Sequence, residues 1–164
     1  KSVFQRGWPK VPAEWKGHRQ LDLNLMLTEL IEVRSQTNRL LESCRNKEAG
    51  IGSSLEAQVQ LELGQGERAD AIANALKDLD SSPYPAVDNL ADWLLVSELT
   101  IGGNNIGEQN PSMILAEFSS DQFSLRIAHA TGEKCERCWH YCTDIGEHSK
   151  HPNICSRCVE VLET

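Results

Sequence analysis

The feature that most constrains this chain of 164 residues is a set of four cysteines in two close pairs. Cys135 and Cys138 form one Cys-x2-Cys pair, and Cys155 and Cys158 form the other, sixteen residues later. Each pair folds as a tight knuckle, so two knuckles together offer four thiolates in a tetrahedron, the geometry that zinc prefers. The spacing is typical of structural zinc sites. We therefore predict one Zn²⁺ per chain, bound by these four side chains.

Other donors near the two pairs leave alternatives open. Cys142 follows the first pair by four residues and competes as a sulfur ligand. Nitrogen ligands are offered by three histidines, His140, His148 and His151. Four thiolates also bind iron. A redox role of the thioredoxin type is the weaker interpretation, because it needs one Cys-x2-Cys pair near a βαβ pattern, whereas here two pairs flank a short polar stretch.

A site closed by four protein sulfurs has a structural role. No coordination position is left for water or substrate, so we expect no catalysis at the metal. Residues 132–164 number only 33, and chains below about 40 residues rarely bury a sufficient core. Metal binding would supply the missing stability, on the order of 10 kcal/mol.

Hydrophobic periodicity predicts a long helix over Arg19–Lys47. No Gly or Pro interrupts the segment, and Gly50-Ile51-Gly52 ends it. The apolar positions that recur at helical spacing are Leu23, Leu27, Leu30, Ile31, Leu41 and Cys44. Because Cys44 belongs to this pattern and is remote from the other cysteines, we expect it to be a buried, inert thiol.

The rest of the chain predicts a small sheet with one or two helices. Apolar and polar residues alternate strictly over Leu55–Leu63, which indicates a half-buried strand. The other predicted elements are an amphipathic helix over Glu67–Leu79, strands over Trp93–Ile101 and Phe123–Ala128, and a short strand over Met113–Phe118. The predicted fold class is α+β: a long N-terminal helix, a mostly antiparallel sheet, and a C-terminal zinc ribbon or finger.

The charge distribution limits where nucleic acid could bind. The net charge is −8, the wrong sign for a simple nucleic-acid binder. Residues 1–50 contain 9 Lys and Arg against 6 Asp and Glu, whereas residues 51–131 contain 3 against 12. If the chain binds RNA, we expect the acidic middle segment to face away from it.

Basic and aromatic side chains near the cysteines and on the first helix suit phosphate contact and base stacking. The RNA-binding candidates are Arg34, Arg39, Arg137, Trp139, His140 and Arg157. Each also has a structural interpretation. Trp139, directly after a knuckle, is more typical of a packing core, and Arg137 and Arg157 are expected to point to solvent.

Motifs of several other classes are missing from the sequence. There is no apolar run of about 18 residues that would span a membrane, and no secretory signal opens the chain. The sequence contains no Gly-rich phosphate loop, nucleophile elbow or zincin motif. By these patterns the chain is a metal-stapled module without a visible active site. Because it starts without Met, we expect an excised fragment.

Several stretches resemble bacterial-type isoleucyl-tRNA synthetases. Residues 30–42, LIEVRSQTNRLLE, resemble the last helix of the anticodon-binding domain in that family, and residues 51–57, IGSSLEA, follow as they do there. Residues 132–141, GEKCERCWHY, and 154–159, ICSRCV, resemble its terminal zinc element. Cys142 departs from the family pattern, which often has Thr there.

The resemblance implies three domains: residues 1–50 as the tail of the helical anticodon-binding domain, 51–131 as a small α+β domain, and 132–164 as a zinc-binding module. It implies a cytoplasmic, monomeric class I parent enzyme that joins isoleucine to tRNA-Ile using ATP and Mg²⁺. The parent's catalytic motifs, of the His-Ile-Gly-His and Lys-Met-Ser-Lys-Ser types, do not occur here. This fragment would therefore position tRNA without catalysing the reaction, and its zinc ligands would be the four paired cysteines.

A similar zinc finger ends certain DNA-repair glycosylases. The alternative function is therefore a DNA-binding end of such an enzyme. The predicted long helix followed by residues 51–57 is not expected in that family.

Overall fold

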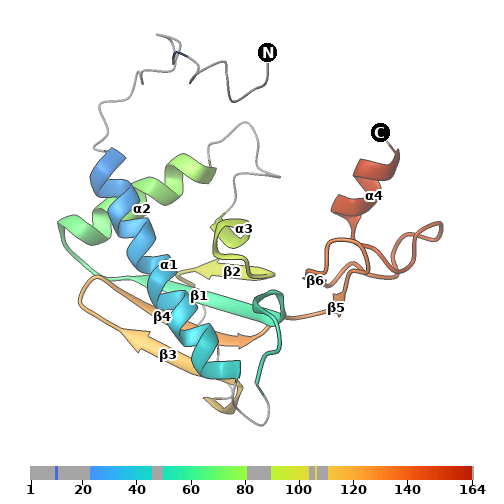
Figure 1. Cartoon of the computed structure of the whole chain (residues 1–164), viewed down its shortest axis with the longest axis horizontal. Coiled ribbons are helices and arrows are strands. Elements are labelled where there is room, and N and C mark those ends of the chain that lie inside the picture. Colours follow the sequence, from blue (N-terminus) through green and yellow to red (C-terminus); the bar gives the residue numbers. More distant parts are fainter. Residues whose placement is uncertain are drawn as a thin grey trace, which may run out of the picture.

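The computed structural model describes residues 23–45, 50–80, 90–103 and 111–163, together with Lys10 and Ile106. These residues form two parts (Figure 1). We call the described residues from 23 to 131 the body and residues 132–163 the cysteine module. The body contains a four-stranded sheet with helices, and the cysteine module lies beside one end of that sheet. The predicted α+β fold class is confirmed.

The central sheet has the strand order β2-β1-β4-β3. Its strands are β1 (Ala57–Leu63), β2 (Glu98–Ile101), β3 (Ala116–Ser119) and β4 (Phe123–His129). β1 pairs in parallel with β2 and antiparallel with β4, while β3 pairs antiparallel with β4. The sheet is therefore mixed, with antiparallel pairs in the majority, as the sequence predicted.

The strand register places apolar side chains on one face of the sheet. Val59 lies opposite Ile127 and Leu61 lies opposite Leu125 across the β1–β4 pair, and all four are buried. Residues between them are mostly polar and point to the other face, since side chains alternate along a strand. Arg126 on that second face forms an ion pair with Glu62 at 3.0 Å. A one-residue slip would exchange the two faces, so this pattern specifies the register.

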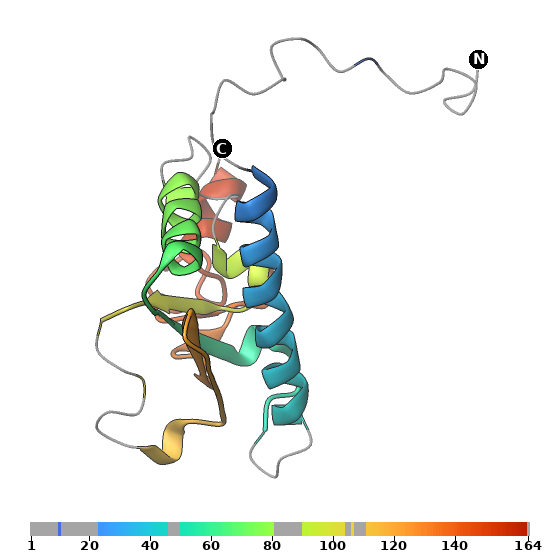
Figure 2. The same cartoon turned by 90° about the vertical axis from the view of Figure 1, so that its left-hand side faces the viewer.

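Two helices pack side by side against the apolar face: α1 (Leu23–Arg45) and α2 (Glu67–Asp80) (Figure 2). The buried positions of α1 follow helical spacing: Glu29, Leu30, Val33, Thr37, Leu41 and Cys44. The hydroxyl of Thr37 donates to the carbonyl of Val33 at 2.8 Å, which satisfies a polar group inside the core. Cys44 is fully buried, as predicted.

Part of the predicted apolar face of α1 is wrong. Leu27 is 49% exposed and Ile31 is 58% exposed, because the buried stripe follows Val33 and Thr37 around the helix. The sequence interpretation left out Val33 and Thr37 and placed Ile31 on the buried face instead. Parts of the predicted helix, residues 19–22 and 46–47, and the side chain of Leu23 lie outside the described residues.

The predicted strand over Trp93–Ile101 is wrong in its first half. Residues Leu90–Leu94 form a short helix, α3, and β2 begins only at Glu98. The helix buries Leu90 and Leu94 at i and i+4, and the chain leaves it through Leu95, whose φ is 59°. A run of apolar residues does not distinguish the two structures at this length.

Two other strands begin later than predicted. β1 begins at Ala57 because Ser54–Glu56 forms a single 3-10 turn, whose cap, Ser53, accepts a hydrogen bond from the Leu55 N–H. β3 begins at Ala116, after a second 3-10 turn at Pro111–Met113.

The chain enters the cysteine module through Gly132, whose φ is +81°. A Cβ atom at this position would lie 2.2 Å from the carbonyl oxygen of Cys142. Only glycine allows the two segments to approach this closely, because it has no Cβ and adopts positive φ without strain.

Substitution of Gly132 by Ala should weaken the pairing of residues 133–134 with residues 141–142. We compare it with Gly146→Ala, since Gly146 also has positive φ, at 92°, but a Cβ there would have no neighbour within 4 Å. The Gly146 variant should lose about 1–2 kcal/mol from backbone strain alone. The Gly132 variant should lose clearly more, and amide exchange at Cys135 measures this. Equal losses in the two variants would contradict the steric argument.

Candidate metal centre

Three short elements position the four paired cysteines. β5 (Glu133–Lys134) and β6 (Tyr141–Cys142) form a hairpin, and α4 (Ser156–Glu163) follows the second pair. Cys135 and Cys138 lie in the connection of the hairpin. Cys155 immediately precedes α4, and Cys158 lies in its first turn. The module is thus a two-stranded hairpin with a C-terminal helix.

The four sulfur atoms lie within 4.8 Å of one another. The Sγ atoms of Cys135 and Cys158 are 3.9 Å apart, and those of Cys138 and Cys155 are 3.7 Å apart. A tetrahedron with zinc–sulfur bonds of about 2.3 Å has edges of about 3.8 Å. Two of the six sulfur–sulfur distances match this edge and the others do not exceed 4.8 Å, so the cluster is compatible with a tetrahedral zinc site.

Backbone hydrogen bonds hold the first knuckle in shape. The N–H of Cys135 donates to the carbonyl of His140 at 2.8 Å, and the N–H of Trp139 donates to the carbonyl of Cys135 at 3.0 Å. The two pairs are also linked directly, since the N–H of Cys155 donates to the Cys135 sulfur at 3.4 Å.

The sulfurs differ in how readily they lose a proton. Burial by itself raises the pKa of Cys135, but backbone hydrogen bonds, led by those of Cys138 and Cys155, bring it down to about 6. Burial raises the pKa of Cys158 to about 12. Four negative charges packed this closely need a cation, because burial and mutual repulsion disfavour the thiolate form. A divalent metal would supply that charge, and its binding would release protons.

Cys142 packs against the cluster but is not one of the four grouped donors. Among the described residues, the grouped metal-type donors are the four paired cysteines alone. Burial, followed by the negative charge of Cys155, raises the pKa of Cys142 to about 12. The Nε2 atom of His148 lies 3.0 Å from the Ser156 hydroxyl, and His140 faces the body.

A carboxylate stabilises the start of α4. Asp144 accepts hydrogen bonds from the hydroxyl of Ser156 and from its N–H, the latter at 2.7 Å. These bonds hold the pKa of Asp144 below its ordinary value. A carboxylate at a helix N-terminus also interacts favourably with the helix dipole. Asp144 therefore fixes the helix that presents the second cysteine pair.

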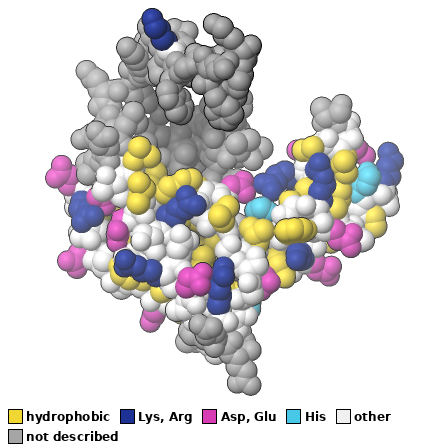
Figure 3. Space-filling model, in the orientation of Figure 1, with side chains coloured by type: hydrophobic (Ala, Val, Ile, Leu, Met, Phe, Trp, Pro, Cys, Tyr) yellow, Lys and Arg dark blue, Asp and Glu magenta, His cyan; other side chains and the backbone are white. Residues whose placement is uncertain are grey.

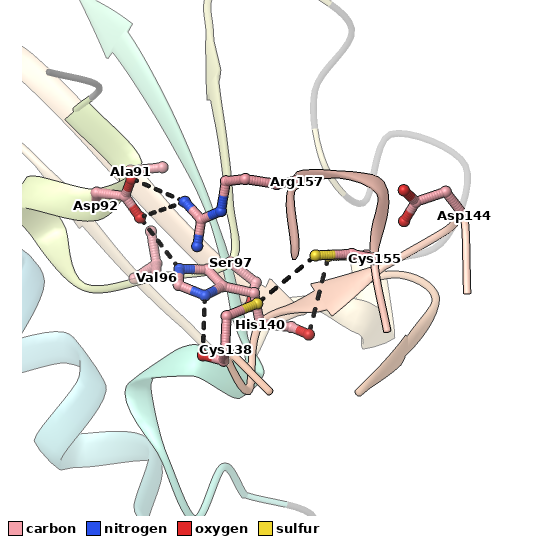
Figure 4. A pocket seen from close by; sticks show the side chains of 10 residues that line it. Ala91, Asp92, Val96, Ser97, Cys138, His140, Asp144, Cys155 and Arg157 are labelled. Atoms are coloured by element: carbon pink, nitrogen blue, oxygen red, sulfur yellow. Dashed lines mark hydrogen bonds and ion pairs between the residues drawn. The ribbon is translucent and has the colours of Figure 1, made fainter. Parts of the chain in front are cut away.

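The cysteine module contacts the body mainly at α3 and the turn before β2 (Figure 4). The N–H of Tyr141 donates to the hydroxyl of Ser97 at 2.8 Å. Asp92 on α3 faces two side chains of the module: His140 Nε2 at 3.2 Å, and Arg157 Nη1 at 3.2 Å. The His140 contact lacks hydrogen-bond geometry, since the buried Nε2 atom has no well-directed partner.

A cavity of about 230 Å³ lies at this junction. Side chains of the body and of the module line it together, including Asp92, Ser97, Cys138, His140 and Arg157. One side of the cysteine cluster therefore faces the body across this cavity.

The predicted RNA-binding candidates differ in what their side chains contact in the structure. His140 and Arg157 both approach Asp92, and Arg157 remains 41% exposed to solvent, as the sequence predicted. Arg34 stacks over the ring of Trp93 at 5.1 Å. Arg39 and Arg137 are exposed.

Trp139 does not form a packing core, contrary to the sequence expectation. Its side chain is 60% exposed, and its φ is 66°, a conformation that non-glycine residues rarely adopt. The ammonium of Lys134 lies 5.7 Å from the centre of the indole ring. The ring projects outward because the knuckle turns the chain sharply at this residue.

Basic and acidic side chains intermix over the visible face of the molecule (Figure 3). That face of the body and module has no large patch of a single charge sign among its described residues. No described helix has both the length and the apolar character needed to span a membrane.

Sequence reasoning missed Asp92 and Ser97, the two body residues that contact the module most directly. Ser97 lies in the segment Trp93–Ile101 that was predicted as a strand, and Asp92 lies immediately before it. Asp92 is separated from Arg157 by 65 residues, and no local spacing links the two positions. A helical interpretation of Leu90–Leu94 would have placed Asp92 on the side of the helix opposite the buried leucines. No pattern in the sequence would have identified Arg157 as the partner of Asp92.

Comparison with known proteins found similarities both for the cysteine module and for nearly the whole chain. Residues 132–161 match the family model described as a zinc finger found in FPG and IleRS. The isoleucine–tRNA ligase of Synechococcus sp. (strain CC9311) is 46% identical over 99% of this chain, which covers 15% of that relative. The corresponding ligase of Prochlorococcus marinus (strain MIT 9313) is 44% identical over the same shares. A third relative, from Synechococcus sp. (strain ATCC 27144), is 35% identical over 99% of this chain and 16% of its own length.

Replacement of any one paired cysteine by Ser should abolish stoichiometric metal. We expect one zinc per chain in the unaltered protein and less than a tenth of that after Cys138→Ser, because three sulfurs leave the site open. Cys142→Ser is the matched control and should keep full zinc. Metal analysis of the purified protein measures both. Loss of zinc in the Cys142 variant alone would overturn the ligand set.

Removal of the Asp144 carboxylate should destabilise the cysteine module. Asp144→Ala leaves the Ser156 N–H without its acceptor, and a lost helix cap costs about 1 kcal/mol. Urea unfolding at pH 7, followed by amide signals of the module, measures the loss. Asp121→Ala, in an exposed turn of the body, is the control and should change little. Equal stability of the two variants would show that this contact is unimportant.

Proposed function

Because the chain is related in sequence, over nearly its whole length, to one part of the isoleucine–tRNA ligases, we propose that it is the C-terminal tRNA-binding and zinc-binding region of such an enzyme. The chain spans about 15% of the length of the relatives it matches. The parent would be a cytoplasmic, monomeric ligase that attaches isoleucine to tRNA-Ile using ATP and Mg²⁺. This region contributes no catalytic motif and acts by positioning the tRNA.

The proposed ligands of a single zinc ion are Cys135, Cys138, Cys155 and Cys158. The observation that supports this best is the convergence of the four sulfurs within 4.8 Å, inside a segment that matches a zinc-finger family. Zinc with four sulfur ligands has a full coordination sphere, so its role is to hold the hairpin and α4 together. The metal thereby fixes the position of the side chains that the module exposes.

Exposed side chains of the module suit contact with single-stranded bases. Trp139 is an indole ring held away from the core, with Lys134 over it. Bases of a tRNA loop stack on such rings, and a nearby cation adds attraction for the backbone. Arg39 and Arg137 are exposed and could contact phosphate, although Arg137 also donates to the Cys158 carbonyl at 3.5 Å. His140 and Arg157 are weaker candidates, because both already face Asp92.

The glycosylase alternative is less well supported. The zinc-finger family includes both kinds of protein, so residues 132–161 alone do not distinguish them. The relatives that match nearly the whole chain, body included, are isoleucine–tRNA ligases.

A binding titration tests the proposal with a matched pair of variants. Trp139→Ala should weaken binding of tRNA-Ile by about tenfold, since stacking on one base is worth about 1–3 kcal/mol. Trp139→Phe keeps an aromatic face and should lose less. Met113→Ala, an exposed apolar residue of the body, should change nothing.

Salt dependence and competitor nucleic acids complete that experiment. Binding of tRNA-Ile should weaken steeply with added salt, because phosphate contacts release counterions. Equal, salt-insensitive binding to tRNA-Ile, a non-cognate tRNA and duplex DNA would contradict the proposed function.

A further inference from the structure

An ion pair joins the cysteine module to the body. The Nη1 atom of Arg157, on α4, approaches the two carboxylate oxygens of Asp92, on α3, at 3.2 and 3.5 Å (Figure 4). The Nε2 atom of His140 lies 3.2 Å from the same carboxylate but lacks hydrogen-bond geometry. Two of the side chains predicted to contact RNA therefore face an anion that belongs to the protein itself.

This ion pair is open to solvent. The side chain of Arg157 is 41% exposed and that of Asp92 is 26% exposed. Exposed ion pairs of this kind are weak, because water and salt screen the attraction. The cavity of about 230 Å³ at the junction borders both side chains, and it is larger than several water molecules at about 30 Å³ each. An anion from outside can therefore reach the guanidinium without unfolding the module.

A phosphate would bind this guanidinium better than the Asp92 carboxylate does. Arginine binds phosphate through paired, charge-assisted hydrogen bonds, which are short and strong. In the contact with Asp92, a single nitrogen is shared between two oxygens at 3.2 and 3.5 Å. RNA presents phosphates all along its backbone, so a bound RNA can replace the carboxylate.

A second contact holds the module on the body when the ion pair opens. The N–H of Tyr141 donates to the hydroxyl of Ser97 at 2.8 Å, and Asp92 takes no part in this bond. Arg157 can therefore exchange one anionic partner for another while the module stays in place.

We propose that Asp92 competes with the RNA backbone for Arg157: the carboxylate occupies the guanidinium while the molecule is free, and a phosphate of the tRNA takes its place in the complex. The inference rests on the proposed tRNA-binding function and deepens it, since it assigns the regulation of one contact. Opening the pair offsets part of the free energy of the new contact, so tRNA binds more weakly than it would to a free Arg157.

The test measures the affinity of the full chain for tRNA-Ile in a double-variant cycle. Asp92→Asn removes the competing charge, and we expect about threefold tighter binding, the scale of an exposed ion pair. Arg157→Gln should weaken binding about threefold in the unaltered protein but about tenfold in the Asp92→Asn background, because there the guanidinium has no competing partner to release. The effects of the two changes should therefore not add.

A charge-matched control separates competition from general electrostatics. Glu147→Gln removes an exposed acid elsewhere in the module. Its effect on affinity should be small, and it should be the same with and without Arg157→Gln, since changes at independent sites add. In the Arg157→Gln background, Asp92→Asn should tighten binding no more than this control does.

Three results would overturn the inference: tRNA binding that is unchanged or weaker in Asp92→Asn, a gain no larger than that of Glu147→Gln, or a gain that Arg157→Gln leaves intact. Amide exchange at Tyr141 identifies the reason, because faster exchange together with weaker binding means that the ion pair only holds the junction together. Failure of the unaltered protein to bind tRNA-Ile would instead refute the proposed function, so the two failures are distinguishable.

Discussion

The cysteine module depends on one interaction, the convergence of four sulfur atoms on a shared centre. Residues 132–163 contain a hairpin with two residues in each strand, and one short helix. Little apolar surface is buried between the hairpin and the helix. Their buried cluster consists of cysteines, with a few partly buried apolar neighbours. Hydrophobic burial on that scale does not offset the entropy of ordering the chain. We expect a bound cation to supply the missing free energy, because it compensates the charge of the thiolates that bind it.

The body is stabilised in a different way. Its apolar sheet face, α1 and α2 share one hydrophobic core, to which buried residues from Leu30 to Ile127 contribute. Such a core needs no metal. The molecule therefore joins a conventionally packed part to a part that depends on coordination, and the contacts of Asp92 and Ser97 join the two. The division of the chain into domains at residues 50 and 131 stays a prediction, although the described part of α1 packs within the core of the body.

Local patterns in the sequence predicted the parts of the structure that local physics determines. The alternation in β1, the amphipathic α2 and the spacing of the two cysteine pairs each depend on neighbours within a few residues, and the structure has all three. The errors arose where tertiary contacts decide. Ile31 and Val33 are both apolar, and only the position of the sheet determines which of them is buried. Trp139 faces solvent because of the backbone turn at the knuckle, and the Asp92–Arg157 contact joins residues with no sequence relation.

The account has a direct test in the coordination of the metal. X-ray absorption at the zinc edge of the purified protein reports the number and type of ligands without any substitution. It should give four sulfur neighbours at about 2.3 Å and no oxygen or nitrogen neighbour, for one zinc per chain. A first shell that includes a light atom, or zinc well below one equivalent, would contradict the claim that the four paired cysteines together bind the ion.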